Sequence, residues 1–147
     1  MSSKAKSVGA VMTPYPYSVS PNDPPLQVRN LMAAHAIRHV PVVEGGKPVS
    51  VITDRDISLA LSVFGDAAAE GSIPLEQICT MNTYMVDASD NLEDVVSHMI
   101  RNHIGSALVL ENKRLAGIFT MTDACKYLLE ILRQQEKLLA NAAEYNQ

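Results

Sequence analysis

A Thr-x-x-Asp motif occurs twice in the chain, as Thr53 with Asp56 and as Thr120 with Asp123. If each threonine stands where a strand turns into a helix, the free backbone N–H groups and the helix dipole favour an anion there. The hydroxyl adds a donor, and an aspartate one turn further along can accept from two vicinal hydroxyls, as acidic residues do on riboses. The same pair also fits a capping box. The motif therefore predicts a helix start, an anion and sugar site, or both.

Basic and aromatic side chains add to this chemistry. Tyr17 and Tyr84 either flank a flat ring such as adenine or belong to a core or hairpin edge, and the sequence leaves both open. Guanidinium and ammonium groups pair well with phosphate. The basic candidates are Arg38, Lys47 and Arg55 in the first half of the chain and Arg114 in the second.

Other reactive residues give weaker patterns. His35 and His39 have the i,i+4 spacing of a metal pair, but no third ligand is nearby and His39 is expected to start a strand. No nucleophile motif such as Gly-x-Ser-x-Gly is present. The two cysteines, Cys79 and Cys125, lack metal-ligand spacing, which favours free thiols in a reducing compartment. We expect neither a metal site nor catalysis.

An internal repeat provides the framework for these residues. Shifting the sequence by 67 positions aligns residues 8–61 with residues 75–128 without a gap. A unit of this length does not readily bury its apolar face alone, so we expect the copies to pack about a pseudo-twofold axis with two related clefts. The identical pairs are Thr13/Thr80, Tyr17/Tyr84, Val19/Val86, Asp23/Asp90, Val28/Val95, Met32/Met99, Ile37/Ile104, Val42/Val109, Glu44/Glu111, Thr53/Thr120, Asp56/Asp123 and Leu61/Leu128.

Each copy is predicted to run strand, helix, strand, strand, helix, which gives an α/β fold with small mixed sheets. Asp23 and Asp90 are the predicted N-caps of the first helices, with Pro24 at the first helical position. The predicted strands are 17–19, 39–43 and 49–52, then 84–86, 107–110 and 115–119, and the closing helices begin near Asp54 and Met121. The expected domains are repeat one at 8–63, a linker at 64–74, repeat two at 75–129 and a helical extension at 130–147.

Composition excludes several classes of protein. Of 147 residues, 47% are hydrophobic and 19% are charged, an ordinary globular mixture. A net charge of −4 argues against binding to nucleic acid, which depends on clustered Lys and Arg. No apolar run is long enough for a membrane span, and the N-terminus lacks a signal-peptide core. The expected location is the cytoplasm, without membrane attachment.

The order of these segments resembles the CBS-domain family, in which paired repeats form a Bateman module. The carriers are Val11-Met12-Thr13-Pro14, residues 37–43 and residues 50–57, with residues 117–123 in the second copy. Two departures stand out: Ser50 replaces a frequent glycine, and Gly105-Ser106-Ala107-Leu108 replaces the Arg-His-hydrophobic-Pro pattern. Because of these departures, the sequence leaves open whether the ligand contacts of the second copy differ from those of the first in shape or in ligand.

The resemblance implies a regulatory module that binds AMP, ADP, ATP, NAD or S-adenosylmethionine between the repeats, as a regulatory ligand rather than a required cofactor, and signals to another protein. In the family, the threonine typically meets the phosphate and the aspartate holds the ribose. The alternative is a ligand-free dimerisation or partner-docking domain. The expected ligand-binding residues are Thr53, Asp56, Thr120, Asp123, Arg38, His39, Tyr17, Tyr84 and Arg55, with none catalytic and none metal-binding.

The chain continues past residue 129 without Gly or Pro. Its apolar positions recur in alternating steps of three and four, which is typical of a seam between two helices. The alternative is a helix that packs on its own domain. We expect the seam, formed between the two subunits of a homodimer. The seam positions are Cys125, Leu128, Leu132, Gln135, Leu139 and Ala142.

Overall fold

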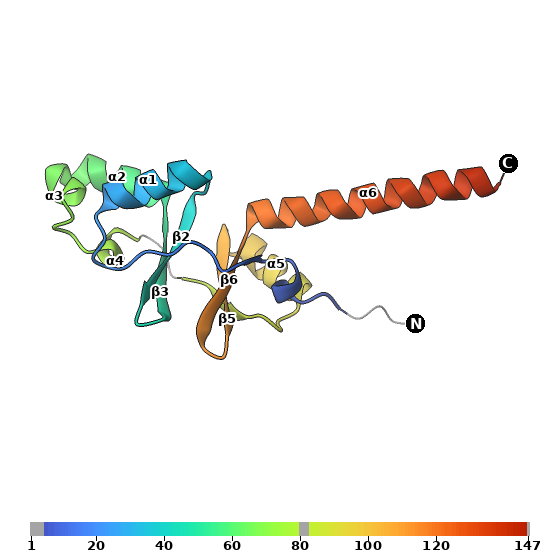
Figure 1. The fold of residues 1–147 in the computed structure, drawn as a ribbon, viewed down its shortest axis with the longest axis horizontal. Helices are drawn as coiled ribbons and strands as arrows, with labels where there is room; N and C mark the ends of the chain where they lie inside the picture. The colour runs from blue at the N-terminus through green and yellow to red at the C-terminus, as the bar shows by residue number, and fades with distance from the viewer. Residues whose placement is uncertain (1–4, 80–82, 147) are drawn as a thin grey trace.

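Two β-hairpins form the centre of the fold (Figure 1). Strands β2 (His39–Glu44) and β3 (Lys47–Thr53) pair antiparallel, as do β5 (Ser106–Glu111) and β6 (Arg114–Thr120). Both two-residue turns have positive φ at both positions, at 59° and 80° for Gly45 and Gly46 and at 52° and 65° for Asn112 and Lys113. This turn geometry matches the right-handed twist of the strands that it joins. The strand pairing confirms both predicted hairpins.

The computed structural model describes residues 5–79 and 83–146. Helices α1 to α4 surround the first hairpin, whereas α5 and the start of α6 accompany the second (Figure 1). The remaining elements are η1 (Val8–Ala10), β1 (Thr13–Pro14), α1 (Pro25–His35), α2 (Asp54–Phe64), α3 (Asp66–Ala69), α4 (Leu75–Ile78), β4 (Met85–Asp87), α5 (Leu92–Arg101) and α6 (Met121–Tyr145).

The two units repeat the same topology with different completeness. In the second sheet, ordered β1-β6-β5-β4, strand β4 runs parallel to β5 with Val86 opposite Val109. The equivalent residues of the first copy, Val19 and Val42, form a single parallel bridge beside β2. The strand predicted at 84–86 is therefore present, and the one predicted at 17–19 is reduced to this bridge.

The first segment of each copy packs on the core of the other copy. Val8 is fully buried in the second core, and its N–H donates to Asp90 O at 2.9 Å. Leu75, its repeat partner, is fully buried in the first core, and its N–H donates to Pro21 O at 3.2 Å. Burying such a side chain contributes about 2 kcal/mol, so this exchange ties the two units together.

The predicted N-caps of α1 and α5 were wrong by one residue. The N-cap of α1 is Pro24, while Asp23 accepts the Ser20 N–H at 2.8 Å. The cap of α5 is Asn91, which accepts the N–H groups of Glu93 and Asp94. Asp90 instead accepts the Asp87 N–H at 3.0 Å. In both copies the aspartate closes the turn before the helix, because its short side chain reaches back three residues.

The closing helices begin where the sequence predicted, at Asp54 and Met121. The expected linker at 64–74 contains α3, whose Ala68 is fully buried in the first core. Helix α6 runs unbroken for 25 residues and projects from the body (Figure 1). It includes the expected extension up to Tyr145; Gln147 lies outside the described residues.

Candidate functional site

A cavity of about 460 Å³ lies where the two units meet. The first unit contributes the end of β3, the start of α2 and the start of β2, and the second contributes Tyr84 and residues 104–106. Register brings these segments together, because His39 lies opposite Thr53 in one hairpin and Ser106 lies opposite Thr120 in the other. Strands β3 and β6 also contact each other. The predicted residues that line the cavity are Arg38, His39, Thr53, Arg55, Asp56 and Tyr84.

Thr53 and Asp56 form a reciprocal capping box at the start of α2. The Asp56 N–H donates to Thr53 Oγ1 at 3.0 Å, and the Thr53 N–H donates to Asp56 Oδ2 at 2.9 Å. Asp56 is only 6% exposed, although it lines the cavity. The capping alternative is therefore confirmed for this copy, and it coexists with a position on the cavity wall.

The charges around the cavity are mixed. Arg38 and Arg55 bring positive charge, and Asp54 and Asp56 bring negative charge to the N-terminus of α2. Arg29 lies 3.9 Å from the Asp54 carboxylate, although both side chains are nearly half exposed, so this ion pair is weak. An anionic group at the helix start would meet the helix dipole and two guanidinium groups.

Burial makes His39 harder to protonate than a solvent-exposed imidazole. Burial lowers the pKa of this imidazole from its ordinary value of 6.5; Asp56 opposes the shift and Arg38 adds to it. The backbone of Gly105 approaches His39 closely, since a Cβ at this position would lie 3.3 Å from Nε2. When neutral, the imidazole offers one acceptor nitrogen on this wall, and the missing side chain of Gly105 leaves space beside it.

The second Thr-x-x-Asp motif has the same local structure and different surroundings. Thr120 and Asp123 also form a capping box, with the Thr120 N–H donating to Asp123 Oδ2 at 2.9 Å. Asp123 Oδ1 accepts the Thr13 hydroxyl at 2.8 Å, so both carboxylate oxygens have protein donors. Neither residue lines the 460 Å³ cavity. Thr80, the repeat partner of Thr13, lies outside the described residues.

The segment that leads into β1 also explains why Ser50 replaces glycine in the first copy. The repeat partner of Ser50 is Gly117, which lies against Met12 and Thr13. A Cβ on Gly117 would collide with Met12 Sδ and lie 2.8 Å from Thr13 O. In the first unit, Cys79 occupies the place of Met12, and its Sγ lies 3.5 Å from Ser50 Oγ. The smaller cysteine leaves space for a serine side chain.

The two tyrosines have different positions. Tyr17 stacks on His35 with ring centroids 3.8 Å apart, and Tyr84 stacks on His98 at 4.2 Å. Only Tyr84 lines the cavity. Lys47 and Arg114 do not line it either; each begins the second strand of its hairpin.

Sequence reasoning missed six residues of the cavity wall. Gly105 and Ser106 had a usable signal, because the 67-residue offset places them at the positions of Arg38 and His39, and a pseudo-twofold axis brings equivalent positions together. Three apolar residues gave no local signal, since apolar wall and apolar core look alike in sequence; they are Val51, Leu59 and Ile104. The sixth is Asp54, an acidic residue that directly follows Thr53 in the chain.

Over the described ranges 5–79 and 83–146, the structure shows neither a metal-ligand cluster nor a membrane-spanning helix. These ranges hold no cluster of three or more His, Cys, Asp or Glu side chains placed around a common metal position. Within the same ranges, no helix combines the length and the apolar character needed to cross a bilayer.

Comparison with known proteins agrees with this architecture. YhcV of Bacillus subtilis, a CBS domain-containing protein, is 32% identical over 119 residues, covering 80% of this chain and 81% of YhcV. The CBS domain pair of protein MJ0100, solved with 5-methylthioadenosine and S-adenosyl-L-methionine, has a TM-score of 0.74 at 24% identity, covering 85% of this chain and 97% of that one. CBSX2, solved with AMP, has a TM-score of 0.71 at 23% identity, covering 85% and 97%.

The repeat found in the sequence coincides with two matches to one family model. The model for the CBS domain matches residues 8–63 and again residues 75–130. Both the internal repeat and the small mixed sheets are thereby accounted for: this chain belongs to the CBS-domain family and is a tandem pair of CBS domains.

Proposed function

We propose that this chain is a regulatory module that binds an adenosyl ligand in the 460 Å³ cavity between its two units. One observation carries the proposal: the capping box of Thr53 and Asp56 opens onto a cavity that also holds Arg38 and, from the opposite unit, Tyr84. The volume falls within the range of about 300–1,000 Å³ that is common for small-molecule sites. Relatives of the same fold bind AMP, 5-methylthioadenosine and S-adenosyl-L-methionine.

The walls supply a partner for each part of such a ligand. Val51, Leu59 and Ile104 offer apolar surface to the adenine ring, with Tyr84 beside them. The Asp56 carboxylate accepts from ribose hydroxyls, as acidic residues do in other nucleotide sites. A phosphate or a carboxylate meets the N-terminus of α2 together with Arg38 and Arg55.

Isothermal titration calorimetry with AMP, ADP, ATP, NAD and S-adenosylmethionine tests the proposal. We expect at least one of them to bind at millimolar concentration or better, with a single strong site per chain. If none binds, the cavity is not an adenosyl site, and the ligand-free docking domain becomes the better description.

A thermal-shift panel separates the two functions at low cost. A ligand that binds only the folded state raises the melting temperature by mass action, and about 100-fold excess over Kd adds about 2.7 kcal/mol. A purely structural domain shows no shift with any of the five compounds. Adenosine alone, without phosphate or methionine, is the control that shows how much of the effect depends on the charged end.

The proposed module carries out no reaction of its own and transmits ligand binding to another protein in the cytoplasm. We further propose that it is a homodimer with α6 at the interface. Three leucines of this helix are strongly exposed in the single chain: Leu128 at 53%, Leu132 at 46% and Leu139 at 71%. A contiguous exposed apolar surface of this kind is typical of a protein–protein interface. Light scattering on the full chain is the direct test, with twice the mass of one chain as the expected result.

A further inference from the structure

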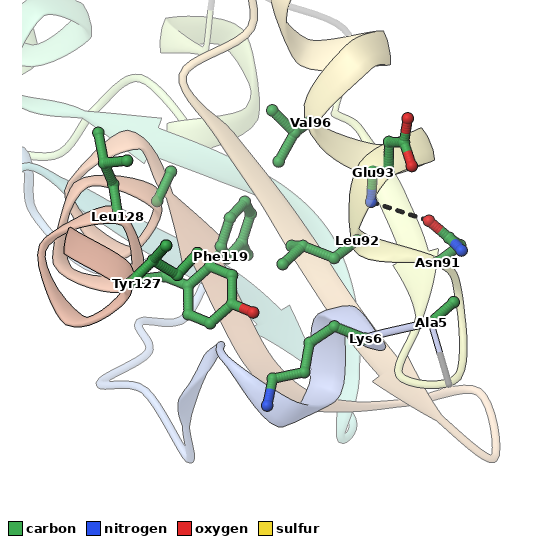
Figure 2. Close-up of a pocket in the computed structure, with 11 residues that line it drawn as sticks. Ala5, Lys6, Asn91, Leu92, Glu93, Val96, Phe119, Tyr127 and Leu128 are labelled. Atoms are coloured by element: carbon green, nitrogen blue, oxygen red, sulfur yellow. Dashed lines mark hydrogen bonds between the residues drawn. The ribbon is translucent and has the colours of Figure 1, made fainter. Parts of the chain in front are cut away.

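A second cavity, of about 410 Å³, lies in the second unit between the start of α5 and the first turns of α6 (Figure 2). Its walls are mainly apolar, and Leu92 and Val96 of α5 face Phe119, Tyr127 and Leu128 across it (Figure 2). Ile131 extends this wall along α6. Apolar side chains that line an open cavity gain from any partner that excludes water.

The first unit shows what covers the equivalent place there. The repeat offset maps Tyr127 and Ile131 onto Ala60 and Phe64, at the end of α2. Directly after Phe64 the chain turns at Gly65, with φ of 57°, and α3 folds back onto both α1 and α2. Ala68 of α3 is fully buried in the core. Helix α6 has no such turn and continues to Tyr145, so no described segment after α6 folds back over this 410 Å³ groove.

The far half of α6 carries strongly exposed apolar side chains. Leu138 is 67% exposed, Leu139 is 71% exposed and Tyr145 is 93% exposed. The helix has 25 residues and is therefore about 37 Å long, and its second half extends away from both units (Figure 1). Among the described residues, an open apolar groove at one end of α6 and exposed apolar side chains at the other end are complementary features.

We propose that two copies pair their α6 helices antiparallel, and that the far end of each helix closes the 410 Å³ groove of the other copy. This inference deepens the proposed homodimer and rests on it. In one register, all the seam positions meet as pairs. Cys125 faces the partner's Ala142, Leu128 faces the partner's Leu139, and Leu132 faces the partner's Gln135.

The same register brings flanking residues into the groove. In an antiparallel pair, the positions beside the seam on one helix meet the matching positions of the other. Ile131 then lies beside the partner's Leu138, and Ala124 lies beside the partner's Tyr145. Ala124 and Ile131 both line the groove. The partner's Leu138 and Tyr145 thus take the role that Ala68 and α3 have in the first unit.

A parallel pair does not fit these observations. The groove lies along residues 124–131, at the start of α6, and a parallel partner places its own start there and its far end about 20 Å or more away. Leu138 and Tyr145 stay uncovered in that arrangement, and Gln135 faces a second Gln135. The antiparallel pair covers both features with one contact.

Disulfide mapping tests the register. In a Cys79→Ala background, Cys125 is the only natural thiol, and Ala142→Cys adds a second one opposite the partner's Cys125. We expect mild oxidation to give a covalent dimer in which the introduced thiol is linked to Cys125. Without Ala142→Cys no covalent dimer is expected, because two Cys125 side chains lie about 25 Å apart along the seam.

The outcomes separate this inference from the proposed homodimer. If the chain is dimeric by light scattering and Cys125 links to Cys125, or no covalent dimer forms with Ala142→Cys, the antiparallel register is rejected and the homodimer remains. If the full chain is monomeric, both fail. Binding of an adenosyl ligand is measured separately and is unaffected by either result.

Two neighbouring substitutions test the contact with the groove. Leu138→Asp places a charge where the groove is apolar, and we expect the dissociation constant of the dimer to rise at least tenfold. Lys137→Asp is the matched control, since this position lies on the side of α6 away from the seam. Circular dichroism establishes that both variants keep their helices. Equal dimer stability in the two variants would show that the groove does not hold the partner's helix.

Discussion

Thr13 donates a hydrogen bond of 2.8 Å to Asp123 across 110 residues of chain. The bond joins β1, from the start of the chain, to the capping box of α6 and leaves neither Asp123 oxygen without a protein donor. It distinguishes the surroundings of the second Thr-x-x-Asp motif from those of the first, in which Asp56 lines the cavity.

Replacing Thr13 tests this tie. Thr13→Val removes the donor while preserving the shape of the side chain, and hydrogen bonds to charged groups contribute about 1.5–3 kcal/mol. Because Thr13 itself is exposed, we expect the free energy of unfolding to fall by about 1–2 kcal/mol in urea titrations. Thr13→Ser keeps the hydroxyl and should stay close to wild type. Equal stability of the two variants would mean that this hydrogen bond does not contribute to the free energy of unfolding.

The two aspartates of the capping boxes should separate ligand binding from capping. Asp56→Asn keeps an acceptor for the cap but removes the negative charge that we propose binds the ribose, so we expect the affinity for the adenosyl ligand to fall about tenfold or more. Asp123→Asn makes the same change at the helix start outside the cavity and should leave the affinity unchanged. Calorimetry on both variants decides, and a matching loss of affinity in the two would assign the effect to capping.

Gly105 should control the width of the cavity. A side chain at this position points toward His39, because even a Cβ lies 3.3 Å from Nε2. Gly105→Val therefore narrows the cavity, and we expect at least a tenfold loss of affinity with a folded protein. Thermal melting without ligand is the control. Wild-type affinity in this variant would place the ligand elsewhere.

Stability should depend on pH through His39. Burial lowers the pKa of His39 in the folded protein below 6.5, the value expected for the unfolded chain. The unfolded state then binds more protons, so the stability that His39 contributes is present above 6.5 and is lost as pH falls below it toward the folded pKa. Melting curves above and below this pH should show a steeper loss for wild type than for His39→Gln. Parallel curves would contradict the prediction.

Local features of the sequence predicted much of this fold. The alternation of apolar runs and turns predicted both hairpins, because strand pairing through a two-residue turn depends on neighbouring residues. Thr53 and Thr120 predicted the starts of α2 and α6 for the same reason, since a capping box spans four consecutive residues. The predicted caps at Asp23 and Asp90 failed by one residue, because a short acidic side chain can serve either a helix start or the turn before it.

The internal repeat, the closing helices and the apolar stripe of α6 were determined by the sequence itself, because each depends on residue types at fixed spacing. Only the tertiary structure decided that the first segment of each copy packs on the other core, and that Thr53 and Asp56 line the central cavity while Thr120 and Asp123 do not. The physical reason is distance along the chain. Thr13 and Asp123 meet only because both units are packed, and the sequence near either residue carries no trace of the other.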